Sequence, residues 1–412
     1  MKLMMLGWEL PPYNSGGLGV ACYYMARALA GKGVAIDFVL PYQADHPQTQ
    51  FMNVVAAVKV PPLVNKNGEY TAMGAYGGNC TWCDSRTCKH ATYYGNSLFE
   101  ATRKYAAAAR RVARRLKPDV IHAHDWLTCE AGVAAKKATG RPLIVHVHAT
   151  EFDRAGGKYG NPLIHEIEYN GLVSADRIIA NSQITKNIIV REYHIPADKV
   201  EVVHNSIDPE ELGCTLVETD NYVYAKFLRS RGHTIVSSVA RLTIMKGFVY
   251  YLEAAALALS RNPNLIFLVV GAGELRDQLI QMSADLGISD KVIFTGFVRG
   301  ERWRELYEVS DIFVMPSIVE PFGLTALEAA HCNTAIVLSE QTGVGEVLSN
   351  VMRFNYWDTR KLADQIINIS LSPGLLSELK DNAAQEVKRF SWANTAERCL
   401  EQYSRAMKGA AA

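Results

Sequence analysis

The stretch IFVMPSIVEPFGLTALEAAHCNTAIVLS (residues 312–339) contains a complete strand–loop–helix–strand unit. Ile312–Met315 and Ala335–Ser339 are short, wholly apolar runs, which is typical of strands covered on both faces of a parallel sheet. Between them, Gly323–Ala330 has the periodicity of a helix. Two strands joined by a helix form a βαβ unit, so this stretch predicts an α/β fold with parallel strands.

The same alternation extends in both directions from this stretch. A first series of buried strands with intervening helices occupies the N-terminal half, and a cleaner series begins near Thr234. Each series of alternating strands and helices predicts one Rossmann-like domain, so we expect two such domains. The expected strands are Leu3–Gly7, Ile36–Leu40, Val120–Ala123, Leu143–Val147, Arg177–Ala180, Thr234–Ala240, Leu265–Val270 and Val292–Thr295, and the expected helices are Gly19–Gly31, Leu98–Leu116, Gly247–Ser260, Leu275–Leu286 and Arg302–Val309.

The length of 412 residues is too great for one ordinary core, which also favours two domains. We expect an N-terminal domain over 1–207 and a C-terminal domain over 208–391. The segment His204–Tyr224 has little periodicity and suits a linker. Trp392–Met407 is amphipathic and predicts a helix, and we expect residues 392–412 to pack back on the N-terminal domain.

The composition excludes some classes of protein. Lys and Arg number 43 against 42 Asp and Glu, so no overall basic field indicates nucleic acid or an anionic membrane as partner. The basic run Arg110–Arg115 lies in a helical pattern, and we interpret it as a solvated face. No apolar stretch approaches a membrane-spanning length, and Lys2–Leu6 predicts a strand rather than a signal peptide. Five of the eight cysteines lie in contexts suited to buried thiols, so we expect a cytoplasmic protein.

A glycine-rich turn follows the first expected strand and runs from Glu9 to Gly19, with Gly16 and Gly17 at its centre. Glycines let backbone N–H groups approach an anion, and the following helix adds its positive end. The Gly-Gly-x-Gly spacing differs from the G-x-G-x-x-G of dinucleotide sites, and the next strand ends without an acid. These departures disfavour an NAD site and leave a tight turn able to bind an anion.

Two cations follow the first strand of the second series, in Arg241-Leu-Thr-Ile-Met-Lys246-Gly247. Ligands of open parallel sheets bind at the carboxyl ends of the strands. A guanidinium fork and an ammonium point charge at that edge suit a diphosphate. A pair of solvated surface charges is the alternative interpretation.

The segment from Glu320 to Glu328 combines two carboxylates with a helix start. Pro321 disfavours helical geometry at Glu320, so that carboxylate belongs to an extended loop. A helix that begins near Phe322 frees backbone N–H groups in its first turn, and Glu328 lies about two turns further along. We expect Glu320 to bind sugar hydroxyls and Glu328 a ribose diol, although two acids near a helix start are also favourable for the helix dipole alone. The residues expected at the phosphates are Phe322, Gly323, Leu324 and Thr325.

Together these segments resemble the family 4 glycosyltransferases and their glycogen and starch synthase relatives, over almost the whole chain. Glu320 and Glu328 match the family's Glu-x7-Glu signature, and Arg241 and Lys246 match its Arg-x4-Lys pair. The remaining matches are Ser15–Leu18, which is similar to the Lys-Thr-Gly-Gly-Leu turn of the synthases with Ser15 at the threonine and Asn14 at the lysine, His122–Trp126, which is similar to their His-Asp-Trp, and His148, which stands where the family has a histidine that contacts the donor sugar.

The resemblance implies a GT-B fold, in which two Rossmann-like domains with parallel sheets face each other across a deep cleft. It also implies a retaining transferase that uses a nucleotide-diphosphate sugar, ADP-glucose or UDP-glucose, and a carbohydrate acceptor. Arg241 and Lys246 would bind the diphosphate with no metal or cofactor, and His148 would orient the sugar. Glu9, His124 and Asp125 are expected on the acceptor side of the cleft.

The acceptor and the class of protein have alternatives. The His-Asp-Trp and Gly-Gly-Leu similarities favour an α-glucan acceptor, and a sugar phosphate, as in sucrose or trehalose synthesis, is the alternative. An epimerase of nucleotide sugars would need acid and base groups at the sugar C2 instead of the Glu-x7-Glu arrangement. A non-catalytic carbohydrate-binding protein would be expected to have lost Arg241, Lys246 or Glu320. The base of the donor and the oligomeric state are left open.

A cysteine-rich loop lies in the irregular stretch between Leu40 and Leu98. Cys80, Cys83, Cys88 and His90 have the spacing Cys-x2-Cys-x4-Cys-x-His, a candidate tetrahedral zinc set. A zinc ion there would be structural. Free thiols or a local disulfide are the alternatives.

Overall fold

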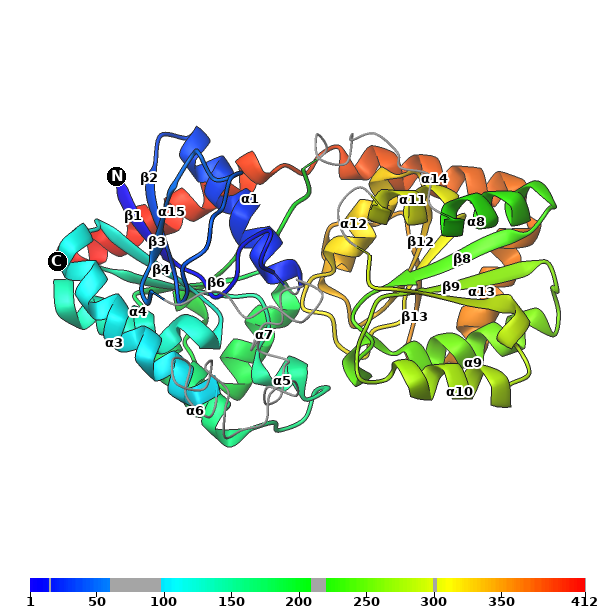
Figure 1. The fold of residues 1–412 in the computed structure, drawn as a ribbon, viewed down its shortest axis with the longest axis horizontal. Coiled ribbons are helices and arrows are strands. Elements are labelled where there is room, and N and C mark those ends of the chain that lie inside the picture. Colours follow the sequence, from blue (N-terminus) through cyan, green and yellow to red (C-terminus); the bar gives the residue numbers. More distant parts are fainter. Residues whose placement is uncertain (15, 60–97, 209–219, 299–301, 412) are drawn as a thin grey trace. The chain divides into compact units, whose positions relative to one another are not determined.

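The computed structural model describes residues 1–14, 16–59, 98–208, 220–298 and 302–411. The prediction of an α/β fold with two parallel sheets is confirmed (Figure 1). The candidate zinc ligands Cys80, Cys83, Cys88 and His90 lie outside the described residues, so that site stays a prediction. The chain divides into two compact units: unit 1 comprises Met1–Arg154, Lys158–Asn205 and Trp392–Ala412, and unit 2 comprises Ala155–Gly157 and Ser206–Ser391.

The described residues of unit 1 form a seven-stranded parallel sheet with the order β3-β2-β1-β4-β5-β6-β7. The strand order reverses between β1 and β4, which are hydrogen-bonded neighbours. Ligands of doubly wound sheets bind at such a reversal, outside the carboxyl ends of the strands. The strands are β1 (Lys2–Leu6), β2 (Ala35–Leu40), β3 (Asn53–Ala56), β4 (Val120–His124), β5 (Leu143–Val147), β6 (Arg177–Ala180) and β7 (Val200–Val202).

The helices of unit 1 form two groups, because right-handed crossovers in opposite directions cover opposite faces of a sheet. In the first group α1 (Gly17–Gly31) packs against α15 (Trp392–Ala411), and in the second α4 (Trp126–Thr139) packs against α3 (Leu98–Leu116) and α6 (Pro162–Ser174). The arginines of α3 at 110, 111, 114 and 115 are exposed, which confirms the solvated face. The described part of unit 1 also contains α5 (Glu151–Arg154) and α7 (Gln183–Glu192).

The last helix, α15, belongs to unit 1. Trp392 at its start stacks on Tyr24 of α1, with ring centroids 5.9 Å apart. Near its end the Tyr403 hydroxyl lies 2.8 Å from His122 Nδ1 in the interior of the unit, where both side chains are fully buried. The C-terminal segment therefore covers the central strands of unit 1.

Unit 2 contains a six-stranded parallel sheet with the order β10-β9-β8-β11-β12-β13, and here the order reverses between β8 and β11. Helix α9 packs against both α10 and α13, α8 packs against α11, and α12 packs against α14. The elements are β8 (Thr234–Val239), β9 (Leu265–Val270), β10 (Val292–Gly296), β11 (Ile312–Met315), β12 (Ala335–Ser339), β13 (Met352–Phe354), α8 (Asp220–Ser230), α9 (Phe248–Leu259), α10 (Arg276–Asp285), α11 (Arg302–Val309), α12 (Leu324–His331), α13 (Thr359–Leu371) and α14 (Pro373–Val387).

The expected linker His204–Tyr224 was too long at its C-terminal end, because α8 begins at Asp220. Tyr222 and Ala225 of α8 are buried against the sheet, but Tyr224 and Phe227 on the same helix are 53% and 50% exposed. Apolar residues on both the buried and the exposed side conceal the helical period in the sequence. None of the helices in the described ranges is long and apolar enough to cross a membrane.

The contact between Tyr403 and His122 can be used to test how much α15 stabilises unit 1 against unfolding. Tyr403→Phe removes the hydroxyl and leaves the buried His122 Nδ1 without its partner, at a cost of about 1–3 kcal/mol. We expect a lower urea midpoint for the unfolding of unit 1, measured by circular dichroism and fluorescence. Tyr169→Phe on the exposed side of α6 is the control and should leave the midpoint unchanged. Equal midpoints for both variants would contradict this account.

Candidate functional site

The point of strand reversal in unit 2 brings two loops together. The loop after β8 contains Arg241 and Lys246, and the loop after β11 contains Glu320. Because β8 and β11 are neighbouring parallel strands, both loops leave the sheet at the same edge. The two cations and the carboxylate singled out from the sequence therefore lie in adjacent loops.

A glycine sets how closely these loops approach. Gly247 has φ +68°, and a Cβ built on it would lie 1.9 Å from the carbonyl oxygen of Pro316. No other residue type tolerates both the backbone conformation and that distance. The approach is closed by a hydrogen bond of 2.8 Å, in which the Ile318 N–H donates to the Met245 carbonyl. Lys246, between these contacts, is consequently held beside the second loop.

Lys246 and Glu320 form an ion pair, with the ammonium nitrogen 2.7 Å from Glu320 Oε2. The pair is largely withdrawn from water, since the side chains are 18% and 12% exposed. The Glu320 backbone is fixed by its N–H, which donates to Gln341 O at 3.0 Å, and by its carbonyl, which accepts from Gly343 N at 2.9 Å. An ammonium group has three donors, so Lys246 can hold Glu320 and still bind a second anion.

The helix after Glu320 begins two residues later than expected. Gly323 precedes α12 with φ +108°, and a Cβ on it would meet Met315 Sδ at 2.8 Å, so the chain turns sharply before the helix starts at Leu324. The side chain of Phe322 is 2% exposed and packs into the core beneath the turn. Leu324 and Thr325 occupy the first turn, whose N–H groups have no partner within the helix and suit a phosphate.

Glu328 lies in the second turn of α12 and accepts a hydrogen bond of 2.9 Å from the Tyr307 hydroxyl. Burial raises the pKa of Glu328 to about 7, and the bond from Tyr307 opposes part of that rise. Its charge therefore changes near neutral pH. Among the residues expected at the donor, the structure joins Lys246 to Glu320, whereas Glu328 is bonded to Tyr307.

A cavity of about 420 Å³ in unit 2 lies away from this edge. Its wall includes Ser310, two residues before β11, and Asn333, two residues before β12, so it lies at the amino ends of the strands. Of its cations, Arg229 and Lys380 both pair with Asp311. Because ligands of open parallel sheets bind at the carboxyl ends of the strands, the position of this cavity disfavours it as the diphosphate site.

The point of strand reversal in unit 1 contains the expected residues of the N-terminal half. Glu9 follows β1 and is 5% exposed, and its Oε1 accepts from the Gly19 N–H at 3.2 Å, which ties the loop to α1. Gly16 and Gly17 are exposed where α1 begins. The first turn of α1 thus offers its N–H groups beside a buried carboxylate.

Asp125 joins the ends of β4 and β5. Its Oδ1 accepts from the N–H groups of His148 at 2.6 Å and Ala149 at 3.3 Å, and its backbone has φ +59°. Burial raises the pKa of Asp125 to about 6, while the charge of Arg154 and these two N–H groups oppose the rise. The His124 ring lies beside that of His148, with Nδ1 and Nε2 3.1 Å apart.

Burial lowers the pKa of His148 to about 3, so this imidazole is neutral at physiological pH. A neutral imidazole has one donor and one acceptor and can orient a hydroxyl group without adding charge. Two neighbours of this ring, Cys22 and His146, are both buried and were not predicted from the sequence. The repeated His-x-His at 122–124 and 146–148 is the signal that could have identified His146.

Two family descriptions match the sequence. Residues 83–211 match "Glycosyltransferase Family 4", and residues 225–386 match "Glycosyl transferases group 1". An uncharacterized glycosyltransferase of Methanocaldococcus jannaschii is 30% identical over 99% of both chains. The glycogen synthase of Mycobacterium tuberculosis is 27% identical over 85% of this chain and 80% of its own length.

Solved structures share the fold. Sucrose-phosphate synthase from Thermosynechococcus elongatus superposes with a TM-score of 0.75 over 99% of both chains at 19% identity. Anabaena HepE in complex with UDP and glucose superposes with a TM-score of 0.72 over 98% of this chain and all of its own, also at 19% identity. With the relative that matches from end to end, these similarities show that the chain belongs to the family 4, or group 1, glycosyltransferases of the GT-B fold.

Proposed function

We propose that this glycosyltransferase transfers glucose from ADP-glucose or UDP-glucose to an α-glucan, with retention of configuration. The observation that carries the proposal is the Lys246–Glu320 pair beside the first turn of α12. It joins a cation for the diphosphate to a carboxylate for sugar hydroxyls at the carboxyl edge of the sheet of unit 2. HepE, a protein of the same fold, has been solved with UDP-glucose, which supports a donor of this class.

In this proposal unit 2 binds the nucleotide. Arg241, Lys246 and the N–H groups at the start of α12 bind the diphosphate, and Glu328 accepts hydrogen bonds from the ribose hydroxyls. Gly16 and Gly17 of unit 1 add backbone N–H groups. Because Lys246 already neutralises Glu320, that carboxylate can bind sugar hydroxyls without repelling the diphosphate.

The chemistry requires stabilisation of the leaving diphosphate, which gains negative charge as the bond to the sugar breaks. Each charge-assisted hydrogen bond aimed at that charge contributes roughly 1.5–3 kcal/mol. Two side-chain cations serve this purpose without a metal ion. The acceptor attacks the face that the diphosphate leaves, which preserves the configuration, and neutral His148 orients the primary hydroxyl of the sugar.

We propose a cytoplasmic location for the reaction. The described cysteines Cys22, Cys129, Cys332 and Cys399 are free thiols, which suits a reducing compartment.

The acceptor has one further candidate. The glycogen synthase relative favours an α-glucan. The D-inositol 3-phosphate glycosyltransferase of Rhodococcus jostii is 29% identical over 73% of this chain and 70% of its own length, which favours a small phosphorylated acceptor. Both candidate acceptors would react with the same class of nucleotide-sugar donor. They differ only in the molecule that attacks the sugar.

A donor screen separates these candidates. ADP-glucose and UDP-glucose are each supplied with glycogen, with inositol phosphate or with no acceptor, and release of nucleoside diphosphate is measured. We expect release that depends on glycogen and on one of the two bases. Release that depends only on the small acceptor would replace the α-glucan, and failure of both donors to bind would contradict the proposed function.

The cations at the diphosphate give the second test. Lys246→Ala and Arg241→Ala each remove charge aimed at the leaving group, so we expect kcat/KM to fall by roughly 10–100-fold, the equivalent of about 1.5–3 kcal/mol. Circular dichroism should report a folded protein in both cases. Lys361→Ala on the exposed side of α13 is the matched control in the same unit. Near-normal turnover in both site variants is the result that would remove this assignment.

The pKa of Glu328 gives the third test. An ionised carboxylate accepts hydrogen bonds from both ribose hydroxyls, whereas the protonated form accepts them poorly. Because the pKa lies at about 7, donor affinity should be complete above that pH and fall as the pH drops through it. We expect the donor KM to rise by up to about tenfold from about pH 8 to about pH 6.

Glu328→Gln keeps the shape of the side chain and can still accept from Tyr307, but it does not titrate. Its KM should be high and independent of pH over the same range. The diphosphate of the intact donor is esterified at both ends and has no proton to lose there. A wild-type KM that stays constant would exclude Glu328 from the ribose site.

A further inference from the structure

Four histidine rings lie against one another in the interior of unit 1. His122 and His124 are two residues apart on β4 and therefore share a face of the sheet, and His146 on β5 is the register partner of His124. His148 directly follows β5. The ring centroids of His122 and His124 are 4.2 Å apart, as are those of His146 and His148.

The four rings are almost inaccessible to water and are neutral. His148 is 8% exposed and the other three are fully buried. Burial lowers the pKa of all four. Among the described residues, His124 Nε2 and both ring nitrogens of His146 have no hydrogen-bond partner. A buried nitrogen without a partner is costly, and the neutral imidazole nitrogen is a common ligand for transition metals.

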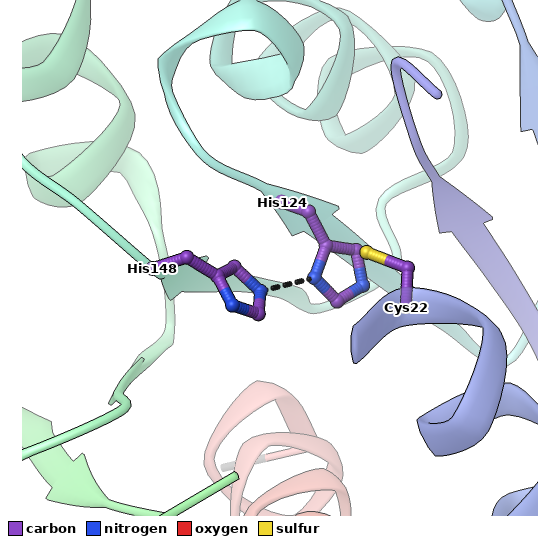
Figure 2. A group of neighbouring side chains, drawn as sticks. All are labelled: Cys22, His124 and His148. Carbon is purple, nitrogen blue, oxygen red and sulfur yellow. Dashed lines mark hydrogen bonds between the residues drawn. The ribbon is translucent and has the colours of Figure 1, made fainter. Parts of the chain in front are cut away.

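A buried thiol lies beside these rings. Cys22 on α1 is 1% exposed, and its sulfur points toward the His124 ring (Figure 2). Cys22, His124 and His148 can each offer one ligand atom, and these atoms all lie within 4.8 Å of one another. Thiolate and imidazole together are the usual ligands of zinc.

The distance between the two imidazoles fits a shared ion. His124 Nδ1 and His148 Nε2 are 3.1 Å apart. Two nitrogens that each lie about 2.0–2.1 Å from one tetrahedral zinc ion are roughly 3.3 Å apart. The rings can therefore become neighbouring ligands with little movement.

The surroundings of the thiol are negatively charged. The carboxylates of Asp125 and Glu9 are both buried, and after burial itself they are the causes that raise the pKa of the Cys22 thiol. Arg154 forms ion pairs with both Glu151 and Glu168, so its positive charge does not fully offset the carboxylates near the thiol. A divalent cation would reverse this field and stabilise the thiolate.

We propose that Cys22, His124 and His148 form a binding site for a thiophilic divalent metal ion such as Zn²⁺, with water as the fourth ligand. Binding forms one metal–sulfur and two metal–nitrogen bonds and releases the Cys22 thiol proton to solvent. The proton of the His124–His148 hydrogen bond moves to the other nitrogen of the ring that carries it. The ligand atoms of a second trio, His122, His124 and His146, also lie within 4.8 Å of one another. It lacks the thiolate, and His122 Nδ1 already bonds Tyr403.

An ion at this site occupies His148 Nε2 and leaves only Nδ1 of that ring for another ligand. If His148 orients the donor sugar through Nε2, the ion inhibits transfer. That consequence rests on the proposed function, whereas the metal site itself does not. Binding measurements and activity measurements can therefore fail separately.

The test is a Co²⁺ titration of the full chain, with Cys80, Cys83 and Cys88 changed to Ser and His90 to Asn so that the candidate loop site is absent. We expect one Co²⁺ per chain, with the near-ultraviolet charge-transfer absorption of a thiolate–cobalt bond. Cys22→Ser, which nearly preserves the volume, should abolish that absorption. It should also weaken Zn²⁺ binding in equilibrium dialysis by at least about 10–100-fold, the loss caused by removing even an outer partner of a metal ligand.

Cys399→Ala is the matched control, because Cys399 is also fully buried in unit 1 but lies on α15 beside Met25. It should leave the absorption and the Zn²⁺ affinity unchanged. Absence of the thiolate absorption in the parent would overturn the proposal, as would its persistence in Cys22→Ser. Undiminished affinity in Cys22→Ser would also overturn it and would assign the ion to the histidine trio.

Discussion

The contact between the loops after β8 and β11 is the constraint on which the candidate site of unit 2 depends. Reversal of the strand order makes these loops neighbours, but only the missing Cβ of Gly247 lets the Pro316 carbonyl lie where a side chain would begin. That approach brings Lys246 to Glu320 and fixes the carboxylate in front of α12. A bulkier residue at position 247 would separate the loops and with them the cation and the carboxylate. The chemistry of the site is thus a consequence of backbone packing.

In unit 1 the ends of two neighbouring strands are held together by a carboxylate, Asp125, rather than by close backbone approach at a glycine. Asp125 has φ +59° and ψ 177°, an extended conformation with positive φ that is nearly confined to glycine and costs on the order of 1–3 kcal/mol for a residue with a side chain. Its two hydrogen bonds to the N–H groups of His148 and Ala149 offset that cost and hold the end of β5 against the end of β4. The result is a rigid pair of histidines beside a buried carboxylate. Unit 2 therefore offers positive charge for an anion, and unit 1 offers neutral ligands in a negative field.

The features predicted correctly from the sequence are those that depend on residues close together along the chain. Apolar runs gave β5, β6, β9, β11 and β12 at their observed bounds, because strands buried on both faces leave an unbroken apolar signal. The position of Glu320 in a loop followed from Pro321. The bond from Tyr307 to Glu328, by contrast, requires α11 to lie against α12, and the burial of Phe322 requires the turn at Gly323. Cys22 on α1 and His124 on β4 meet only through the tertiary fold, and no local pattern encodes that contact.

The neutral charge of His148 determines which residues can stabilise developing charge in the proposed reaction. A ring with a pKa of about 3 carries no charge at neutral pH, so His148 cannot compensate the charge that develops on a diphosphate. In the proposed reaction Arg241 and Lys246 compensate that charge, and His148 contributes only hydrogen bonds. A metal ion on Cys22, His124 and His148 would bring positive charge into unit 1 by occupying His148 Nε2. Since one ring nitrogen cannot bind an ion and orient a hydroxyl at once, the two uses of His148 exclude each other where the sugar also requires Nε2, and the ion is then an inhibitor rather than a catalyst.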